Sequence, residues 1–317
     1  MLVASGCAQT DEPVAEDESS TRRALDASFG IGGVTRISMS PEADRIVAVA
    51  PGSDGSWYGA GFLSTGGDNS MAVARFDENG DPDTSFGQNG FVSVNVATGG
   101  KTAERASGIG VQSSGNVVLA GPVEHDPGAA GDLAGDTDIA AVRFTDDGTP
   151  DPTFGDNGVA RIDLGTGRLV EESFVGDTMF GVTVLEDDKI LLVGAKLHDG
   201  PDETDRDFAV VRLTADGELD PTFGAGGVFV LDIENGNESP RQALELEDGS
   251  VVVAGYTRNS AGVVVPVLLK LDESGALVED FDGDGIASDE LLPSVGEAYA
   301  VDLHNGGFVI TGYGRAA

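Results

Sequence analysis

A short segment centred on a phenylalanine recurs five times along this chain of 317 residues. The copies, called here the phenylalanine boxes, read LDASFGIGG, PDTSFGQNG, PDPTFGDNG, LDPTFGAGG and VEDFDGDGI around Phe29, Phe86, Phe154, Phe223 and Phe281. Successive phenylalanines are 57, 68, 69 and 58 residues apart. Self-similarity at such a period is typical of repeat architectures, in which each repeat is one supersecondary unit. The sequence therefore predicts a tandem array.

Each repeat contains four short apolar runs separated by turn residues. Asp248-Gly249 and Asn305-Gly306 join a first run to a second, and Asx-Gly between apolar runs is a strong hairpin signal because both turn residues need positive φ. The third run alternates and ends in a basic and a large apolar residue, as in residues 139–144 and 208–213. The fourth run follows the box, as in residues 159–164. The pattern predicts four antiparallel strands per repeat.

Four strands in about 57–69 residues are typical of a β-propeller blade. We therefore expect an all-β, propeller-like array of about five four-stranded antiparallel blades over residues 24–317, with the last blade incomplete. The chain opens on an expected outermost strand at residues 33–38 and closes after the second run of the fifth repeat. A truncated product, a distorted five-bladed ring and stacking with another copy all remain open as explanations.

The phenylalanine of each box is predicted to be a structural residue. Such a ring buries about 150–250 Å² against its own blade and the next one, and the flanking glycines permit a tight backbone. A ring of five aromatic ligand contacts is the alternative that the pattern favours less.

The boxes, followed by an Asx-Gly hairpin and a VVRL-type strand, resemble the delta-60 repeat. The resemblance covers roughly residues 24–314 and is weakest in the fifth copy, where Asp282 replaces the glycine after Phe281. It implies a tandem-repeat secreted or surface protein of bacteria. It implies no activity, because that family has none to transfer onto residues of this chain.

The amino terminus resembles a bacterial lipobox. Small residues precede Cys7, the only cysteine, and an acidic stretch without periodicity follows it. We expect residues 1–23 to form a lipidated start at Cys7 and a disordered tether. Only Met1, Leu2 and Val3 stand before the lipobox, where a secretory signal needs an apolar stretch, so either the true start codon lies upstream or the match is chance. The alternative is an incidental free thiol. The expected location is the cell envelope, anchored by lipid to the outer membrane, or the medium.

The charge balance excludes some partners. The chain has 55 acidic and 18 basic residues, a net charge of -37. A surface with this much negative charge repels nucleic acid and anionic lipid headgroups. We therefore expect no nucleic-acid partner, and no membrane contact except through the lipid anchor. The remaining partner classes are an unidentified protein or glycan. A single cysteine also excludes a disulfide within the chain.

Three motifs suggest chemistry, and each has a structural alternative. Asp280, Asp282 and Asp284 resemble a calcium loop, although Leu291 occupies the position of its bidentate Glu. We favour a drifted box turn and expect no metal or other cofactor. His125 and His198 occupy matching places in adjacent repeats, where two imidazoles suit one shared metal; solvated loops are the favoured interpretation. Residues 99–102 imitate a phosphate loop but lack its first glycine.

The sequence thus predicts a non-enzymatic binding or scaffold propeller, with no catalytic residue and with recognition, if present, in the loops 122–137 and 196–206. The alternative is a calcium-dependent or otherwise metal-dependent propeller hydrolase or lactonase. That alternative needs metal ligands at the axial ends of the inner strands. The positions taken as equivalent there, Glu104, Asp177, Arg241 and Glu297, are mixed in sign, which argues against a shared cation.

Overall fold

Every regular element that the structure describes is a β-strand. The computed structural model describes residues 25–98, 103–126, 135–170, 173–198, 205–233, 236–259 and 261–315. Within them, no helix is long and apolar enough to cross a membrane. Cys7, the tether and the phosphate-loop imitation at residues 99–102 lie outside the described residues, so these predictions stay predictions.

Three sheets each contain four antiparallel strands in chain order. The first consists of β1 (Asp44–Pro51), β2 (Trp57–Thr65), β3 (Asp68–Phe76) and β4 (Phe91–Val94). The second consists of β5 (Gly108–Val111), β6 (Val117–Glu124), β7 (Thr137–Phe144) and β8 (Val159–Ile162). The third consists of β11 (Thr178–Val184), β12 (Ile190–Leu197), β13 (Arg206–Leu213) and β14 (Val228–Leu231). They are the predicted blades.

A fourth blade carries an additional hairpin. Its antiparallel strands are β15 (Ser239–Glu245), β16 (Val251–Arg258), β17 (Val264–Leu271) and β18 (Ile286–Ser288). The hairpin of β19 (Val295–His304) and β20 (Gly307–Arg315) joins this sheet through one parallel pair, Val264 with Val295. The incomplete fifth blade is thus this hairpin. A small ribbon of β9 (Arg168–Val170) and β10 (Ser173–Val175) lies between the second and third blades in the chain.

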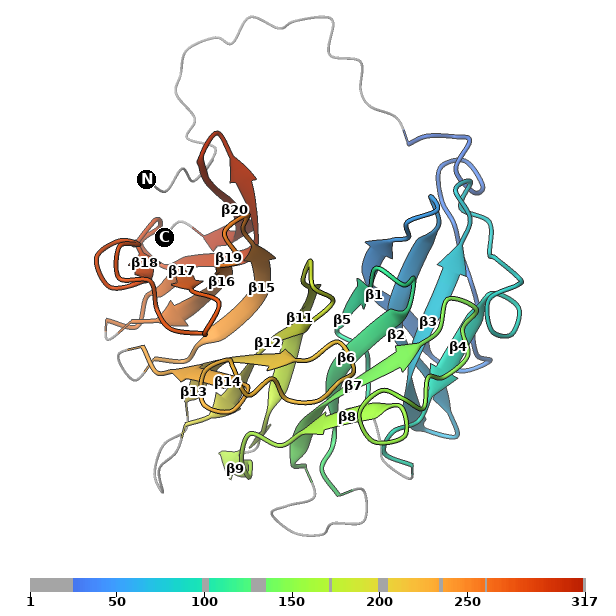
Figure 1. The fold of residues 1–317 in the computed structure, drawn as a ribbon, viewed down its shortest axis with the longest axis horizontal. Coiled ribbons are helices and arrows are strands. Elements are labelled where there is room, and N and C mark those ends of the chain that lie inside the picture. The colour runs from blue at the N-terminus through green and yellow to red at the C-terminus, as the bar shows by residue number, and fades with distance from the viewer. Residues whose placement is uncertain are drawn as a thin grey trace, which may run out of the picture.

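The blades fan out around a common centre, as Figure 1 shows. The first strands β1, β5, β11, β15 and β19 contact one another in that order and lie nearest the centre. Hydrophobic clusters fill the spaces between successive sheets. In Figure 1 the first blade and the β19–β20 hairpin stand at the two ends of the arc without meeting. The all-β, propeller-like prediction is confirmed.

The expected outermost strand at residues 33–38 is not a regular strand, so that prediction was wrong. Only an isolated bridge between Gly30 and Val34 forms there. In the other repeats the fourth strand pairs with the third strand of its own blade, as β4 does with β3. No such third strand lies beside residues 33–38 among the described residues. Ile37 and Met39 instead pack on the core of the first blade.

The central boxes each connect one blade to the next. Phe86, Phe154 and Phe223 are almost fully buried. Each ring packs against a glycine in the turn after the next blade's third strand. At Gly217, for example, a Cβ would lie 2.8 Å from the Phe154 ring and φ is +86°. The box glycine adds a backbone hydrogen bond to the same turn: Gly87 to Asp147, Gly155 to Asp216 and Gly224 to Ser274, at 2.7–2.8 Å. The structural interpretation of these phenylalanines is confirmed.

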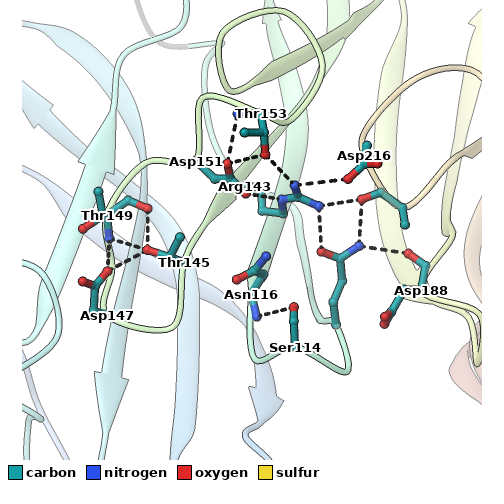
Figure 2. A network of polar contacts seen from close by, with 12 residues as sticks. Ser114, Asn116, Arg143, Thr145, Asp147, Thr149, Asp151, Thr153, Asp188 and Asp216 are labelled. Carbon is teal, nitrogen blue, oxygen red and sulfur yellow. Dashed lines mark hydrogen bonds and ion pairs between the residues drawn. The ribbon is translucent and has the colours of Figure 1, made fainter.

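The basic residue of the third strand supports the same joint. The Arg143 guanidinium donates to Asp151 of its own box at 2.8 Å and lies 5.0 Å from the Phe154 ring centre. It also donates to the carbonyl oxygen of Ala215 in the next blade at 2.7 Å, at the centre of the network in Figure 2. Arg212 repeats this arrangement one blade later, with Asp220, Phe223 and the Glu273 carbonyl.

Candidate functional site

The groups that are suited to binding lie at the edge of the blades opposite the phenylalanine boxes. This edge is called here the loop rim. It is formed where second strands end, third strands begin and fourth strands end. The loops 122–137 and 196–206 leave from this rim, although residues 127–134 and 199–204 lie outside the described part of the chain. Two arrangements occur there: a pocket lined by arginines, and a pair of histidine–carboxylate groups.

A buried carboxyl group precedes the first strand of each of the three central blades. These are Glu104, Asp177 and Glu238, each at most 2% exposed. The three acids occupy equivalent positions in their blades. In each blade, a glycine of the second strand lies against the backbone carbonyl oxygen of the residue that follows the acid. Those glycines are Gly121, Gly194 and Gly255, which face Arg105, Thr178 and Ser239.

This alignment corrects the set of inner-strand positions taken from the sequence. In the β19–β20 hairpin the corresponding glycine is Gly312, which lies against the carbonyl oxygen of Glu297. The position equivalent to Glu104 is the residue before Glu297, which is Gly296. Arg241 lies three residues beyond the acid position, which Glu238 occupies. The connections between blades differ in length and the first strands contain bulges, so counting along the chain misplaced both residues. The equivalent positions of the central blades are all acidic.

The three acids differ in how well they are satisfied. Glu104 accepts backbone hydrogen bonds from Met71, Val96 and Ala97 of the preceding repeat at 2.9–3.3 Å. Asp177 accepts one from Leu164 at 2.6 Å, and its Oδ1 has no hydrogen-bond partner among the described residues. Burial, reinforced by Asp163 and other nearby carboxylates, raises the pKa of Asp177 to about 7.

Glu238 is the least satisfied of the three. Its Oε1 accepts a hydrogen bond from the Thr257 hydroxyl at 2.6 Å, and its Oε2 has no partner among the described residues. Burial, together with repulsion from Asp232, Asp207 and Asp205, raises the pKa of Glu238 to about 8. The carboxyl group is therefore largely protonated at neutral pH.

Three arginines converge on a pocket of about 300 Å³ between the third and fourth blades. They are Arg206 from β13, Arg241 from β15 and Arg258 from β16. None of the three forms an ion pair with a carboxylate of the described residues. The rest of the lining consists of Phe180, Asn237, Glu238, Ser239, Tyr256 and Val264.

Two of these guanidinium groups have unused donors. The Nε atoms of Arg206 and Arg241 are buried and have no hydrogen-bond partner among the described residues. Burial lowers the pKa of Arg206, because the charge is removed from water without a compensating carboxylate. An unpaired, buried donor of a charged group is costly. The pocket therefore offers positive charge to an anionic group.

Aromatic rings fix the position of Arg241. Its guanidinium carbon lies 4.2 Å from the Phe180 ring centre and 5.1 Å from the ring centres of Tyr256 and Tyr299. It also donates to the Tyr256 hydroxyl at 2.6 Å. Such cation–π contacts restrain a long side chain and leave its other donors free. Phe180 and Tyr299 belong to the neighbouring first strands β11 and β19, so the rings come from both sides.

Each of the two rim histidines is part of a carboxylate group in its own blade. His125 Nδ1 lies 2.7 Å from Asp138 Oδ1, and His198 Nδ1 lies 2.8 Å from Asp207 Oδ1. These bonds raise the pKa of both histidines. His125, Asp138 and Asp163 form one group whose ligand atoms lie within 4.8 Å of one another; His198, Asp205, Asp207 and Asp232 form the other. The two histidines thus belong to separate groups; His125 is an exposed loop residue, as the favoured interpretation predicts, and His198 is partly buried.

The calcium-like segment adopts the box turn, as the favoured interpretation predicts. Gly285 donates to the Phe281 carbonyl at 2.8 Å, and Gly158 makes the equivalent bond to Phe154 at 2.8 Å. Asp282 takes the positive φ, 55°, of the box glycine that it replaces. The exposed side chains of Asp280, Asp282 and Asp284 are not in either converging group of the described residues.

Sequence reasoning found the histidines but missed the arginine pocket. Arg206, Arg241 and Arg258 lie in different strands and match no motif, and only the fold brings them together. The carboxylate partners were also missed. The repeat itself contained a usable signal, because Asp138 and Asp207 occupy the second position of equivalent third strands.

Comparison with protein families agrees with this architecture. Four segments match one family model, described as a domain of unknown function (DUF5122) beta-propeller: residues 52–86, 112–154, 185–223 and 246–277. Three of these segments end on a box phenylalanine. These four segments are thus similar to DUF5122 beta-propeller repeats. A comparison with curated proteins finds no match.

Among solved structures, similar chains include two arabinan-degrading enzymes and one bifunctional protein. The endo-arabinase from Bacteroides thetaiotaomicron VPI-5482 is 17% identical over 69% of this chain and 72% of its own, with a TM-score of 0.36. The bifunctional GH43-CE protein from Bacteroides eggerthii is 12% identical over 83% and 25%, with a TM-score of 0.34. The endo-1,5-alpha-L-arabinanase from Thermotoga petrophila RKU-1 is 14% identical over 84% and 59%, with a TM-score of 0.35. This chain thus spans about a quarter of the second protein.

Proposed function

We propose that this protein is a non-catalytic binding or scaffold propeller that holds a negatively charged group of a protein or glycan ligand in the arginine pocket. The single observation that carries the proposal is the convergence of Arg206, Arg241 and Arg258, none of which pairs with a carboxylate of the described residues. Guanidinium groups are well suited to carboxylate recognition, because their N–H donors match its two oxygens.

The strongly acidic composition makes this pocket selective. In a chain with 55 acidic and 18 basic residues, an unpaired positive site is a local exception. Long-range repulsion of an anionic ligand is screened within about 8 Å at physiological salt, whereas contacts inside the pocket are screened less.

The proposal includes the location expected from the amino terminus. The lipobox-like residues before Cys7 and the acidic stretch after it support export to the bacterial cell envelope and attachment through lipid. The likeness of the boxes to delta-60 repeats supports the same setting. Labelling cells with radioactive palmitate tests the anchor: incorporation is expected in the wild type and absent in Cys7→Ala.

The binding proposal is tested with two anionic probes, polygalacturonate and poly-glutamate, and with neutral dextran, at 0.15 M salt. We expect at least one anionic probe to bind and dextran not to bind. Arg241→Gln should weaken binding at least tenfold, and Arg36→Gln, which alters an exposed arginine outside the pocket, should leave it unchanged. Equal binding by the Arg241 variant, or no binding by either anionic probe, contradicts the proposal.

A further inference from the structure

We propose that the group of His198, Asp205, Asp207 and Asp232, called here the third-blade group, binds one divalent transition-metal cation of the zinc type. This inference goes beyond the proposed function and does not depend on the arginine pocket. Its four ligand atoms, one from each residue, lie within 4.8 Å of one another. An imidazole nitrogen with carboxylate oxygens is a donor set that suits zinc and manganese, whereas calcium prefers oxygen alone.

The fold positions the four residues independently of any ion. His198 directly follows β12, Asp207 is the second residue of β13, and Asp232 directly follows β14. Three neighbouring strands of one antiparallel sheet thus bring the side chains to one end. His198 Nδ1 lies 2.8 Å from Asp207 and 4.0 Å from Asp232. Asp207 is only 5% exposed, so its carboxylate is held in place.

The neighbouring blade supplies the first independent observation, because its equivalent group already holds a cation. There Asp138 receives the Arg161 guanidinium, with 2.6 Å between Nε and Oδ2. Arg161 pairs across the sheet with Ala140, and Val230 pairs with Ala209 in the same register of the third blade. Where the second blade has Arg161, the third blade therefore has Val230, and no guanidinium enters its group. Among the described residues, Asp207 thus lacks the guanidinium that its equivalent Asp138 receives.

Unpartnered buried oxygens supply the second observation. Oδ2 of Asp205, within the group, is buried and has no hydrogen-bond partner among the described residues. Glu238 is 1% exposed, and its Oε2 likewise has no partner there. Repulsion from Asp232, Asp207 and Asp205 contributes to the raised pKa of Glu238, behind the effect of its burial. A cation at the third-blade group would offset this accumulation of negative charge.

One lysine lies near the group without filling it. Lys196 is the cross-strand neighbour of Asp207, but its ammonium extends toward Gly165 of the preceding linker, where a Cβ would lie 3.8 Å from Nζ.

The test is isothermal titration of the untagged full chain with ZnCl₂, and with MnCl₂ and CaCl₂ for comparison. We expect about one zinc per chain, with calcium at least tenfold weaker. His198→Gln should weaken zinc binding at least tenfold. His125→Gln is the matched control in the second-blade group and should retain the wild-type affinity.

Exchanging the internal cation between the two blades gives the sharper comparison. Val230→Arg, at a position 42% exposed, should abolish zinc binding because the guanidinium would occupy the third-blade group. Arg161→Val should raise the stoichiometry toward two. Circular dichroism melts establish that each variant is folded. Absence of zinc binding by the folded wild type, or binding that neither His198→Gln nor Val230→Arg reduces, overturns the proposal.

Discussion

The joint between blades depends at the residue scale on one phenylalanine and one glycine. The Phe154 ring lies against Gly217, whose φ of +86° is unfavourable for other residues and whose missing Cβ leaves the space for the ring. Arg143 covers the ring from the same side. A side chain here therefore packs against two blades at once, and its loss is not confined to one sheet.

Phe154→Ala should destabilise the protein by about 3–5 kcal/mol, the range for truncating a buried aromatic residue. Phe281→Ala is the matched control, because that ring is only half-buried and faces the last hairpin, 6.0 Å from Phe308. We expect the control to lose clearly less stability in urea unfolding at pH 7. Equal losses would show that the box residue does not join successive blades.

At the scale of the strand, each first strand of a central blade begins with a buried acid. Asp177 binds the amide of Leu164, which follows the fourth strand of the preceding blade, so the acid connects two blades through a backbone group. This hydrogen bond favours the ionised carboxylate, but burial and the nearby carboxylates penalise the charge of Asp177 more strongly, so the folded state favours the protonated form.

The raised pKa of Asp177, about 7 when folded against a model value of 3.8, gives stability a definite pH dependence. The group's contribution is present below about pH 4 and is lost as the pH rises through 7. Asp177→Asn, which does not ionise, should therefore gain on the wild type by about 1.4 kcal/mol per unit between pH 5 and 7. Unfolding at several pH values measures this difference. A difference that stays flat across this pH range would contradict the assignment.

The strands themselves could be predicted from the sequence, because glycine turns and apolar alternation are local signals. The hairpin turn at Asp248-Gly249 and the turns of the phenylalanine boxes mark where strands end, and they therefore predict where each blade begins and ends. The buried acid Glu238 could not be placed, because it follows a connection shorter than the one before Asp177, and only the position of Gly255 against Ser239 reveals the equivalence. The failed strand at residues 33–38 has a related cause, since a strand needs a pairing partner that local sequence does not show.

At the scale of the whole molecule, the fold brings charged residues from separate strands and loops into two local groups. The net charge of -37 was evident from composition, but neither the arginine pocket nor the third-blade group was. Both lie on the loop rim of the third and fourth blades, in the middle of the arc rather than at its open ends (Figure 1). The residues that form them are far apart in the sequence, and the repeat register brings them together.

The central claim is that the boxes join successive blades into one arc, and amide hydrogen exchange resolved by residue tests it most directly. The amides of Gly87, Gly155 and Gly224 each donate to the next blade's turn at 2.7–2.8 Å. They should exchange as slowly as the strand amides and together with them, because opening them requires separating two blades. Exchange of these three amides at the rate of an unprotected loop would contradict the account.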